Sequence, residues 1–417
     1  MEASASERHE AIVIGAGPAV LATAATLKLA GVPNVVLDRA EAVGSAWRTH
    51  YERLHLHTVR WLSNLPGYPI PRRHGRWVAR DGVVSYLEDY ARHHQLDVRL
   101  GTEVQRIERD GDRWRVRTSS GDMTAPYVVV ASGFNHTPQL PDLPGRDGFE
   151  GELLHAKSYR NAEPYRGRDV LVVGTGNTGA EIAVDLVEQG AARVRVAVRT
   201  PPHILPRAAM GMPGQLVGVM IRRLPAKLAD AIIRNNQRIF IGDLADKGLP
   251  VPSEGVYSRM LRTGGVPILD IGFAKLVERG EVEIVSALEG FDGRDVLLAG
   301  GDRIQPDAVI AATGYSRGLE PLVGHLGVLD ERERPVVHGP YTERGAPGLH
   351  FIGFSDPISG MFREINIDAW KIARAIADDR RGPPANITHR PGPLGDRALA
   401  KLSVRLRRGS QVGTKVP

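Results

Sequence analysis

The chain has 417 residues, of which 42% are hydrophobic and 24% charged, as expected for a globular protein with two or three hydrophobic cores. Its formal net charge is +6 at pH 7, but Lys and Arg are scattered along the chain except near its end. This distribution favours a surface that attracts phosphorylated ligands over one that binds nucleic acid. The chain contains no cysteine, which excludes disulfide reductase chemistry, iron–sulfur clusters and thiolate metal sites.

No apolar run reaches the length of a membrane span, and no signal peptide is recognisable before Ala11. We therefore expect a cytoplasmic protein without stable membrane insertion, whose partners are small molecules. The sequence predicts no metal site and leaves the oligomeric state open.

The first motif is a glycine-rich loop in a strand–helix–strand unit. A buried strand over Ala11–Ile14 precedes the loop, and a second strand over Asn34–Leu37 ends at Asp38. The acid lies about twenty residues beyond the glycines, as in dinucleotide-binding fingerprints. The unit is therefore predicted to bind a dinucleotide.

Each position of this loop has a physical role. Gly15 permits a tight turn, and Gly17 lets the backbone approach a pyrophosphate at the N-terminus of the following helix. Asp38 is predicted to accept hydrogen bonds from ribose hydroxyls. The third fingerprint position is Val20 instead of Gly or Ala, which is a departure from the pattern.

The rest of the first domain reads as a helix and a β-meander. A helix is predicted over Val83–His93, and alternating strands lie on either side of the turns at 110–112 and 120–122. A further buried strand then runs to Ser132-Gly133, at the edge where cofactors bind.

A second glycine-rich unit begins with a strand over Asp169–Val173. Its fingerprint is a complete GxGxxG, and the expected cofactor contacts are Gly174, Gly176, Asn177, Thr178 and Gly179. The next strand ends near Arg199, where an NAD-selective site would place an acid. A guanidinium there suits the 2′-phosphate of NADP; the alternative is a solvated surface charge.

Two amphipathic helices are predicted on either side of Pro225. We expect their apolar faces to pack on the domain, with a substrate channel as the alternative; these faces are Leu216, Val219, Met220, Leu228, Ile232 and Ile239. Beyond them, a strand pair is expected near 282–285 and 296–298. Another buried strand begins at Ala308, and a helix covers Ile365–Ala377. The basic, Pro-rich tail from Gly382 is expected to be disordered.

Two dinucleotide units in one chain indicate an electron relay from a nicotinamide to a flavin. The predicted fold class is α/β, with two Rossmann-like domains for FAD and NADP and an inserted β-meander. The expected organisation is an FAD domain over 1–148 and 307–380, a linker over 149–168, an NADP domain with a helical insert over 169–306, and a tail over 381–417.

The segment between the two loops carries Phe149-x-Gly151-x-x-x-His155-x-x-x-Tyr159, followed by Arg160. This pattern resembles the signature of class B flavin-containing monooxygenases, and the resemblance covers essentially residues 10–378. The chain is most similar to YUCCA-type and related bacterial enzymes, on the motifs at 44–47, 54–57, 176–179, 198–206, 267–272 and 312–315.

The resemblance implies a monooxygenase that uses FAD, NADPH and O2. NADPH reduces the flavin, O2 forms a C4a-(hydro)peroxyflavin, and a small organic substrate receives one oxygen atom. The substrate is expected to be a 2-oxo acid of the indole-3-pyruvate type, or a compound with a nitrogen or sulfur centre. One alternative is an NADPH-dependent flavin reductase or oxidase without substrate oxygenation; another is a module that only senses dinucleotides.

Where many relatives have an Asn beside the flavin, this chain has His57, as in the YUCCA-like branch. His57 is thus the candidate catalytic residue, with simple packing on the flavin as the alternative. His155 is expected to act in the linker, and Asp356–Phe362 could touch FAD. Further expected cofactor contacts are Arg39, Trp47, Arg48, Ser132, Gly133, Thr313 and Gly314. For Trp47 and Arg48, simple core packing is the alternative.

Overall fold

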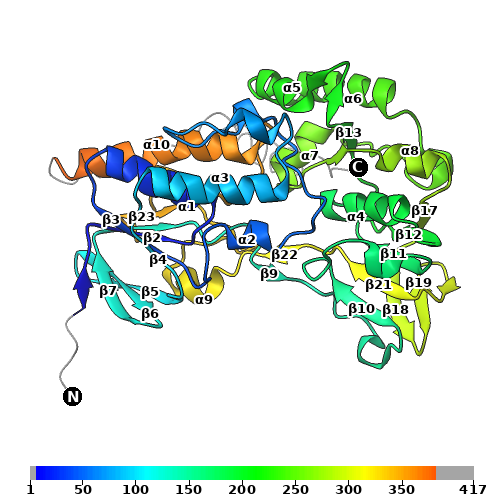
Figure 1. Cartoon of the computed structure of the whole chain (residues 1–417), viewed down its shortest axis with the longest axis horizontal. Coiled ribbons are helices and arrows are strands. Elements are labelled where there is room, and N and C mark those ends of the chain that lie inside the picture. The colour runs from blue at the N-terminus through cyan, green and yellow to red at the C-terminus, as the bar shows by residue number, and fades with distance from the viewer. Residues whose placement is uncertain (1–5, 382–417) are drawn as a thin grey trace, which may run out of the picture.

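The computed structural model describes residues 6–381, and the basic tail predicted to be disordered lies outside them. Two parallel β-sheets stand side by side, each with its own helices (Figure 1). The first sheet has the strand order β23 (Leu349–Phe351), β8 (Tyr127–Val130), β2 (Ala11–Ile14), β3 (Asn34–Leu37) and β4 (Val98–Arg99). Its apolar strands other than the edge strand β4 are buried because both faces of the sheet are covered.

One face of this sheet is covered by helices and the other by the β-meander. The helices are α1 (Pro18–Leu29), α3 (Arg80–His93) and α10 (Met361–Asp379) (Figure 1). The opposite face packs against Trp114, which is fully buried in the meander. The meander has the strand order β1 (Glu7–Arg8), β7 (Gly121–Ala125), β6 (Arg113–Thr118) and β5 (Val104–Asp110). The predicted inserted meander is therefore confirmed.

The second sheet repeats this plan around the second glycine-rich loop. Its strand order is β10 (Glu152–His155), β21 (Ala308–Ala311), β11 (Asp169–Val173), β12 (Arg193–Ala197) and β17 (Glu283–Val285), all parallel. Helices α4 (Asn177–Glu188) and α8 (Phe273–Glu278) pack against it. The expected linker thus contributes strand β10 to this sheet. Strand β21 pairs with β10 on one side and with β11 on the other, so the chain leaves the sheet only after Ala311.

The strand pair expected near 282–285 and 296–298 is wrong. Residues Glu283–Val285 pair with β12 of the second sheet. Strand β19 (Asp295–Leu298) instead forms a separate antiparallel sheet with β18 (Leu288–Asp292) and β20 (Arg303–Ile304). The turn at 293–294 places β18 and β19 together, and this local hairpin replaces the pairing expected with residues 282–285.

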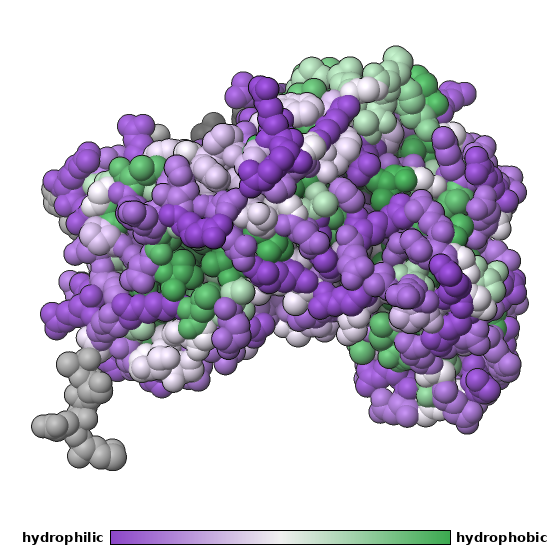
Figure 2. Space-filling model, in the orientation of Figure 1, coloured by the Kyte–Doolittle hydropathy of each residue, from purple (hydrophilic) through white to green (hydrophobic). Residues whose placement is uncertain are grey.

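The helical insert comprises α5 (Gly214–Ile221), α6 (Ala226–Phe240) and α7 (Val256–Thr263). Its predicted apolar face is wrong at four positions, since 39–63% of Met220, Leu228, Ile232 and Ile239 is exposed. Apolar residues accordingly appear on the surface over α5 and α6 (Figure 2). The buried contacts are made instead by Gly218, Ile221, Ala229 and Ile233. Small residues allow this closer approach: a Cβ on Gly218 would lie 2.3 Å from the Ile358 carbonyl oxygen.

The remaining α-helices and strands are short. They are α2 (Ser45–Arg48), β9 (Thr137–Pro138), β13 (Ile204–Pro206), β14 (Ala208–Ala209), β15 (Met212–Pro213), β16 (Ile268–Asp270), β22 (Tyr315–Ser316) and α9 (Glu320–Val323). Pairing of β9 with β22 and of β13 with β16 connects segments that are distant in the sequence. Within residues 6–381, no helix has both the length and the apolar character needed to cross a membrane.

Candidate functional site

A cavity of about 570 Å³ opens at the carboxyl ends of the first sheet's strands. The predicted residues Gly15, Asp38, Arg39 and Ser132 all line it. Parallel α/β sheets bind ligands at this edge, because the loops that follow the strands converge there. The structure thus brings together residues that the sequence spreads over more than a hundred positions.

The glycines of the first loop have two distinct functions. Gly15 has φ +114°, and a Cβ there would lie 2.8 Å from the Ala131 carbonyl oxygen, so only glycine fits. At Gly17, the N-cap of α1, no atom lies within 4 Å of an added Cβ. Gly17 therefore presents open backbone at a helix N-terminus, as a pyrophosphate requires.

Two polar groups of the cavity suit a dinucleotide. The Asp38 carboxylate accepts a hydrogen bond from the Ala40 amide at 2.7 Å, and burial raises the pKa of this carboxyl. The Ser132 hydroxyl is buried and has no hydrogen-bond partner among residues 6–381. A buried hydroxyl without a partner is costly, and a bound ligand would satisfy it. These residues fit FAD.

Of the other predicted contacts of the first unit, Trp47, Arg48 and Gly133 lie outside the cavity, whereas Arg39 lies at its rim. Trp47 packs edge-on against Phe362 of α10, with ring centroids 6.0 Å apart. Arg48 pairs with Glu88 of α3. Gly133 has φ +102° in the turn after β8, and Arg39 lies 3.6 Å from Glu103 at the cavity rim.

The second loop repeats the turn and adds a tighter helix contact. Gly174 has φ +110°, and its added Cβ would lie 2.6 Å from the Ala312 carbonyl oxygen. A Cβ on Gly179 would lie only 2.1 Å from the Gly174 carbonyl oxygen, whereas Gly176 is open. The loop therefore has the close helix packing and the exposed backbone of a dinucleotide site.

The side chains at the start of α4 and at the end of β12 are placed differently. Asn177 donates to the Pro267 carbonyl at 3.2 Å and accepts from the Leu269 amide at 2.7 Å, which binds β16 to the first turn of α4. Arg199 lies two residues beyond β12 and is exposed, so its guanidinium is accessible to a phosphate.

The signature segment joins the two units. His155 donates from Nε2 to the Gly314 carbonyl at 3.1 Å, while its Nδ1 accepts from the Lys157 amide at 3.0 Å. Burial lowers the pKa of His155, which keeps the ring neutral in this role. The Tyr159 hydroxyl donates to Asp185 of α4 at 2.7 Å. These contacts agree with the linker role expected for His155.

The residues around this segment continue the connection. Arg160 donates to the carbonyls of Arg48 and His50, at 3.3 and 3.2 Å. The Thr313 hydroxyl donates to the Gln139 carbonyl beside the β9–β22 ladder. Thr313 thus lies in the crossing between the two units, next to Gly314.

His57 lies against the second unit. Its Nε2 contacts the carboxylate of Glu181 on α4, which is 3% exposed. The buried Tyr51 hydroxyl lies beside Glu181 and Thr178; burial and the Glu181 carboxylate raise the pKa of Tyr51 well above its ordinary value. Tyr51 therefore stays protonated. Sequence reasoning missed Glu181, because nothing in the pattern of its helix indicates that a histidine 124 positions away will meet it.

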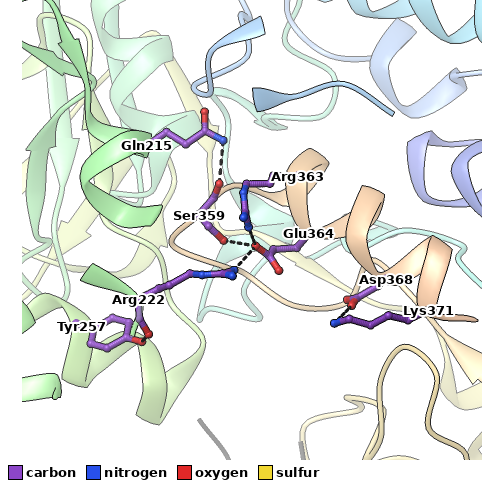
Figure 3. Close-up of polar contacts among 8 residues, drawn as sticks. All are labelled: Gln215, Arg222, Tyr257, Ser359, Arg363, Glu364, Asp368 and Lys371. Carbon is purple, nitrogen blue, oxygen red and sulfur yellow. Dashed lines mark hydrogen bonds and ion pairs between the residues drawn. The ribbon is translucent and has the colours of Figure 1, made fainter. Parts of the chain in front are cut away.

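A polar cluster connects the helical insert to the first dinucleotide unit, here called the flavin-side unit (Figure 3). Glu364, in the first turn of α10, accepts hydrogen bonds from Arg222 at 2.8 Å and from Ser359 at 2.6 Å. Gln215 of α5 donates to the Ser359 carbonyl at 2.8 Å and accepts from the Val59 amide at 3.0 Å. The insert is therefore bound beside the segment that carries His57.

Comparison with known proteins agrees with this architecture. A family model described as pyridine nucleotide-disulphide oxidoreductase matches residues 12–204, although the chain has no cysteine with which to form a redox-active pair. An indole-3-pyruvate monooxygenase, YUCCA1 of Oryza sativa subsp. japonica, is 34% identical over 362 residues, covering 84% of this chain and 89% of that protein.

Solved structures share the fold. A flavin-containing monooxygenase from Stenotrophomonas maltophilia aligns with a TM-score of 0.69 at 23% identity, over 89% of this chain and 99% of that one. Cyclohexanone monooxygenase from Rhodococcus sp. Phi1, bound to NADP+, also aligns with a TM-score of 0.69, at 20% identity, over 97% of this chain and 90% of that one.

Proposed function

The chain belongs to the family of YUCCA-type flavin-containing monooxygenases, and from this premise we propose that it oxygenates an aromatic 2-oxo acid of the indole-3-pyruvate type. It is an NADPH- and O2-dependent oxidoreductase that uses FAD. The observation that carries the substrate proposal is the 34% identity to an indole-3-pyruvate monooxygenase over 84% of the chain.

Two sets of residues would hold the cofactors. Gly15, Gly17, Asp38 and Ser132 would hold FAD. The loop from Gly174 to Gly179, with Arg199, would hold NADPH. Bound FAD, once reduced by NADPH, supplies the activated oxygen.

The chain's own task is to position the substrate and exclude water. In the proposed reaction, one atom of O2 enters the organic acid and the other leaves as water. The bond between the carboxyl carbon and the 2-oxo carbon breaks, CO2 departs, and NADPH supplies the two electrons.

His57 is proposed to act beside the reacting atoms, held in orientation by Glu181. A buried carboxylate that contacts one ring nitrogen fixes the orientation of the neighbouring histidine ring. This contact comes from α4 of the NADPH unit, so His57 would also keep that unit against the flavin-side unit. We expect His57→Gln to reduce the yield of oxygenated product per NADPH several-fold, because the space left by the imidazole ring admits water.

Labelled dioxygen tests the reaction. With ¹⁸O2, NADPH and indole-3-pyruvate, the purified flavoprotein should form indole-3-acetate with one labelled oxygen. His57→Gln should lower the ratio of product to NADPH consumed, whereas the exposed control variant His325→Gln should leave that ratio unchanged. Rapid NADPH consumption with hydrogen peroxide and no labelled organic product would instead identify a flavin oxidase, the alternative function.

A further inference from the structure

Two arginines lie over the indole ring of Trp77. The Cζ atom of Arg207 is 4.6 Å from the ring centroid, and that of Arg76 is 5.2 Å from it. Arg76 also lies 5.8 Å from the ring of Trp61, which is 45% exposed. This group of Arg76, Arg207, Trp61 and Trp77, here called the Trp77 cluster, was not identified from the sequence.

Within the described residues 6–381, neither arginine of the Trp77 cluster forms a direct salt bridge. Among residues 6–381, no carboxylate oxygen lies within 4.0 Å of either guanidinium. Arg76 donates from Nη2 to the Gly211 carbonyl at 2.6 Å, but its buried Nε has no partner. Two adjacent guanidinium groups that are not directly paired with a carboxylate cost free energy when they are partly removed from water.

The ionisation of Arg207 reflects this environment. Burial lowers the pKa of the Arg207 guanidinium, and the charges of Arg53 and Arg76 lower it further, while the carboxylates of Glu181 and Asp270 oppose this effect. An arginine nevertheless stays charged at neutral pH. An anion placed between Arg76 and Arg207 would relieve their mutual repulsion.

The Trp77 cluster lies where the two dinucleotide units meet. The Leu56 amide donates to the Val78 carbonyl at 2.8 Å, which places Trp77 beside the segment carrying His57. On the other side, the Arg207 amide donates to the carbonyl of Asp270, at the end of β16. Strand β16 is the one bound to Asn177 at the start of α4. The cluster is thus adjacent to the His57–Glu181 contact.

We propose that Arg76 and Arg207 bind an oxyanion, held by their guanidinium donors next to the Trp61 and Trp77 rings. Resting on the proposed function, the source that the aromatic side chains favour is the carboxylate of an aromatic 2-oxo acid. Guanidinium forks match carboxylates in a bidentate manner, and indole rings pack against planar aromatic groups. A phosphate of NADPH is the other source of the same chemistry.

Calorimetric titration of the FAD-loaded enzyme tests the proposal. The probes are phenylpyruvate and NADP+, each added to the wild type, Arg207→Met, Arg207→Lys and the exposed-arginine control Arg223→Met. Arg207→Met should raise the Kd for phenylpyruvate roughly tenfold or more, with a smaller rise for Arg207→Lys, because the ammonium keeps the charge but lacks the fork. The Kd for NADP+ should stay within about twofold of the wild-type value in both variants.

The outcomes separate the two sources of the oxyanion. A rise confined to NADP+ would support the site with a phosphate as its ligand. Unchanged Kd values for both probes, in Arg207→Met and also in Arg76→Met, would overturn the proposal. FAD content and the thermal midpoint confirm that each variant is folded. Because no turnover is needed, an enzyme that binds phenylpyruvate yet forms no oxygenated product would contradict the proposed reaction and leave the site standing.

Discussion

The glycine-rich loops of the two dinucleotide units make the same kind of turn, but the helices that follow them pack differently. In both, the first glycine lies against the carbonyl that follows the neighbouring strand, Ala131 for Gly15 and Ala312 for Gly174. At the third fingerprint position, the first unit has the wholly buried Val20, whereas the second has Gly179 with no room for a Cβ. In the second unit, the third glycine is therefore required for the helix to pack against its loop, independently of the approach of a ligand.

The units also differ in the charges at their openings. The first presents the half-buried carboxylate of Asp38, which lines the cavity and whose pKa burial raises. The second presents Arg199 and the guanidinium of Arg207. The first set suits neutral ribose hydroxyls and the second suits phosphate or carboxylate, as expected if the units hold different ligands.

The largest effect is expected from Gly179→Ala. The added Cβ would lie 2.1 Å from the Gly174 carbonyl oxygen, so α4 must move away from its loop. We expect a loss of about 2 kcal/mol or more of local stability and a fall of more than tenfold in the rate of flavin reduction by NADPH. Stopped-flow absorbance measures this rate.

The matched variant in the first unit is Val20→Ala. Truncating this buried side chain should cost about 1–3 kcal/mol through the cavity that it leaves, with little change in the NADPH reaction. Wild-type reduction rates in Gly179→Ala would show that the contrast in helix packing has no functional consequence.

The charge difference between the units is tested by Arg199→Ala and Asp38→Ala. Removing the Arg199 guanidinium should raise KM for NADPH roughly tenfold and leave KM for NADH nearly unchanged, because only NADPH has the 2′-phosphate. Asp38→Ala should instead reduce the fraction of enzyme that retains FAD. Steady-state kinetics and the flavin absorbance measure the two effects. Equal losses with NADPH and NADH would contradict the role of Arg199.

The smallest effect is expected from Asp356→Asn, as a dependence of stability on pH. Burial raises the pKa of Asp356 to about 6, against the opposing charge of Arg317. The folded state then holds this proton more tightly than the unfolded state, so the carboxyl lowers stability as pH rises from about 4 to about 6.

Asparagine at position 356 cannot ionise, so the variant does not lose stability as the pH rises. The FAD-free variant should exceed the wild type by on the order of 1–2 kcal/mol at pH 7.5 and match it near pH 4. Thermal midpoints recorded across this range provide the measurement. A difference that does not change with pH would show that Asp356 titrates normally.

Much of the chain's organisation could be read from local patterns. The strands at Ala11–Ile14 and Asp169–Val173 are short apolar runs before glycine turns, and both form as predicted. The signature around His155 indicated the monooxygenase family, to which the chain belongs. These features are local because glycine geometry and apolar periodicity depend on neighbours in sequence.

Tertiary contacts decided the rest. Their partners are far apart in the sequence: His57 meets Glu181, Trp77 meets Arg207, and β21 joins β11. The packed faces of α5 and α6 were predicted incorrectly at Met220 and at three positions of α6, because the close approach at Gly218 and Ala229, rather than the largest side chains, determines which side packs. Local sequence thus determined the two nucleotide loops and the connecting signature. Only long-range packing decided which side chains meet between them, since burial and charge pairing depend on the whole fold.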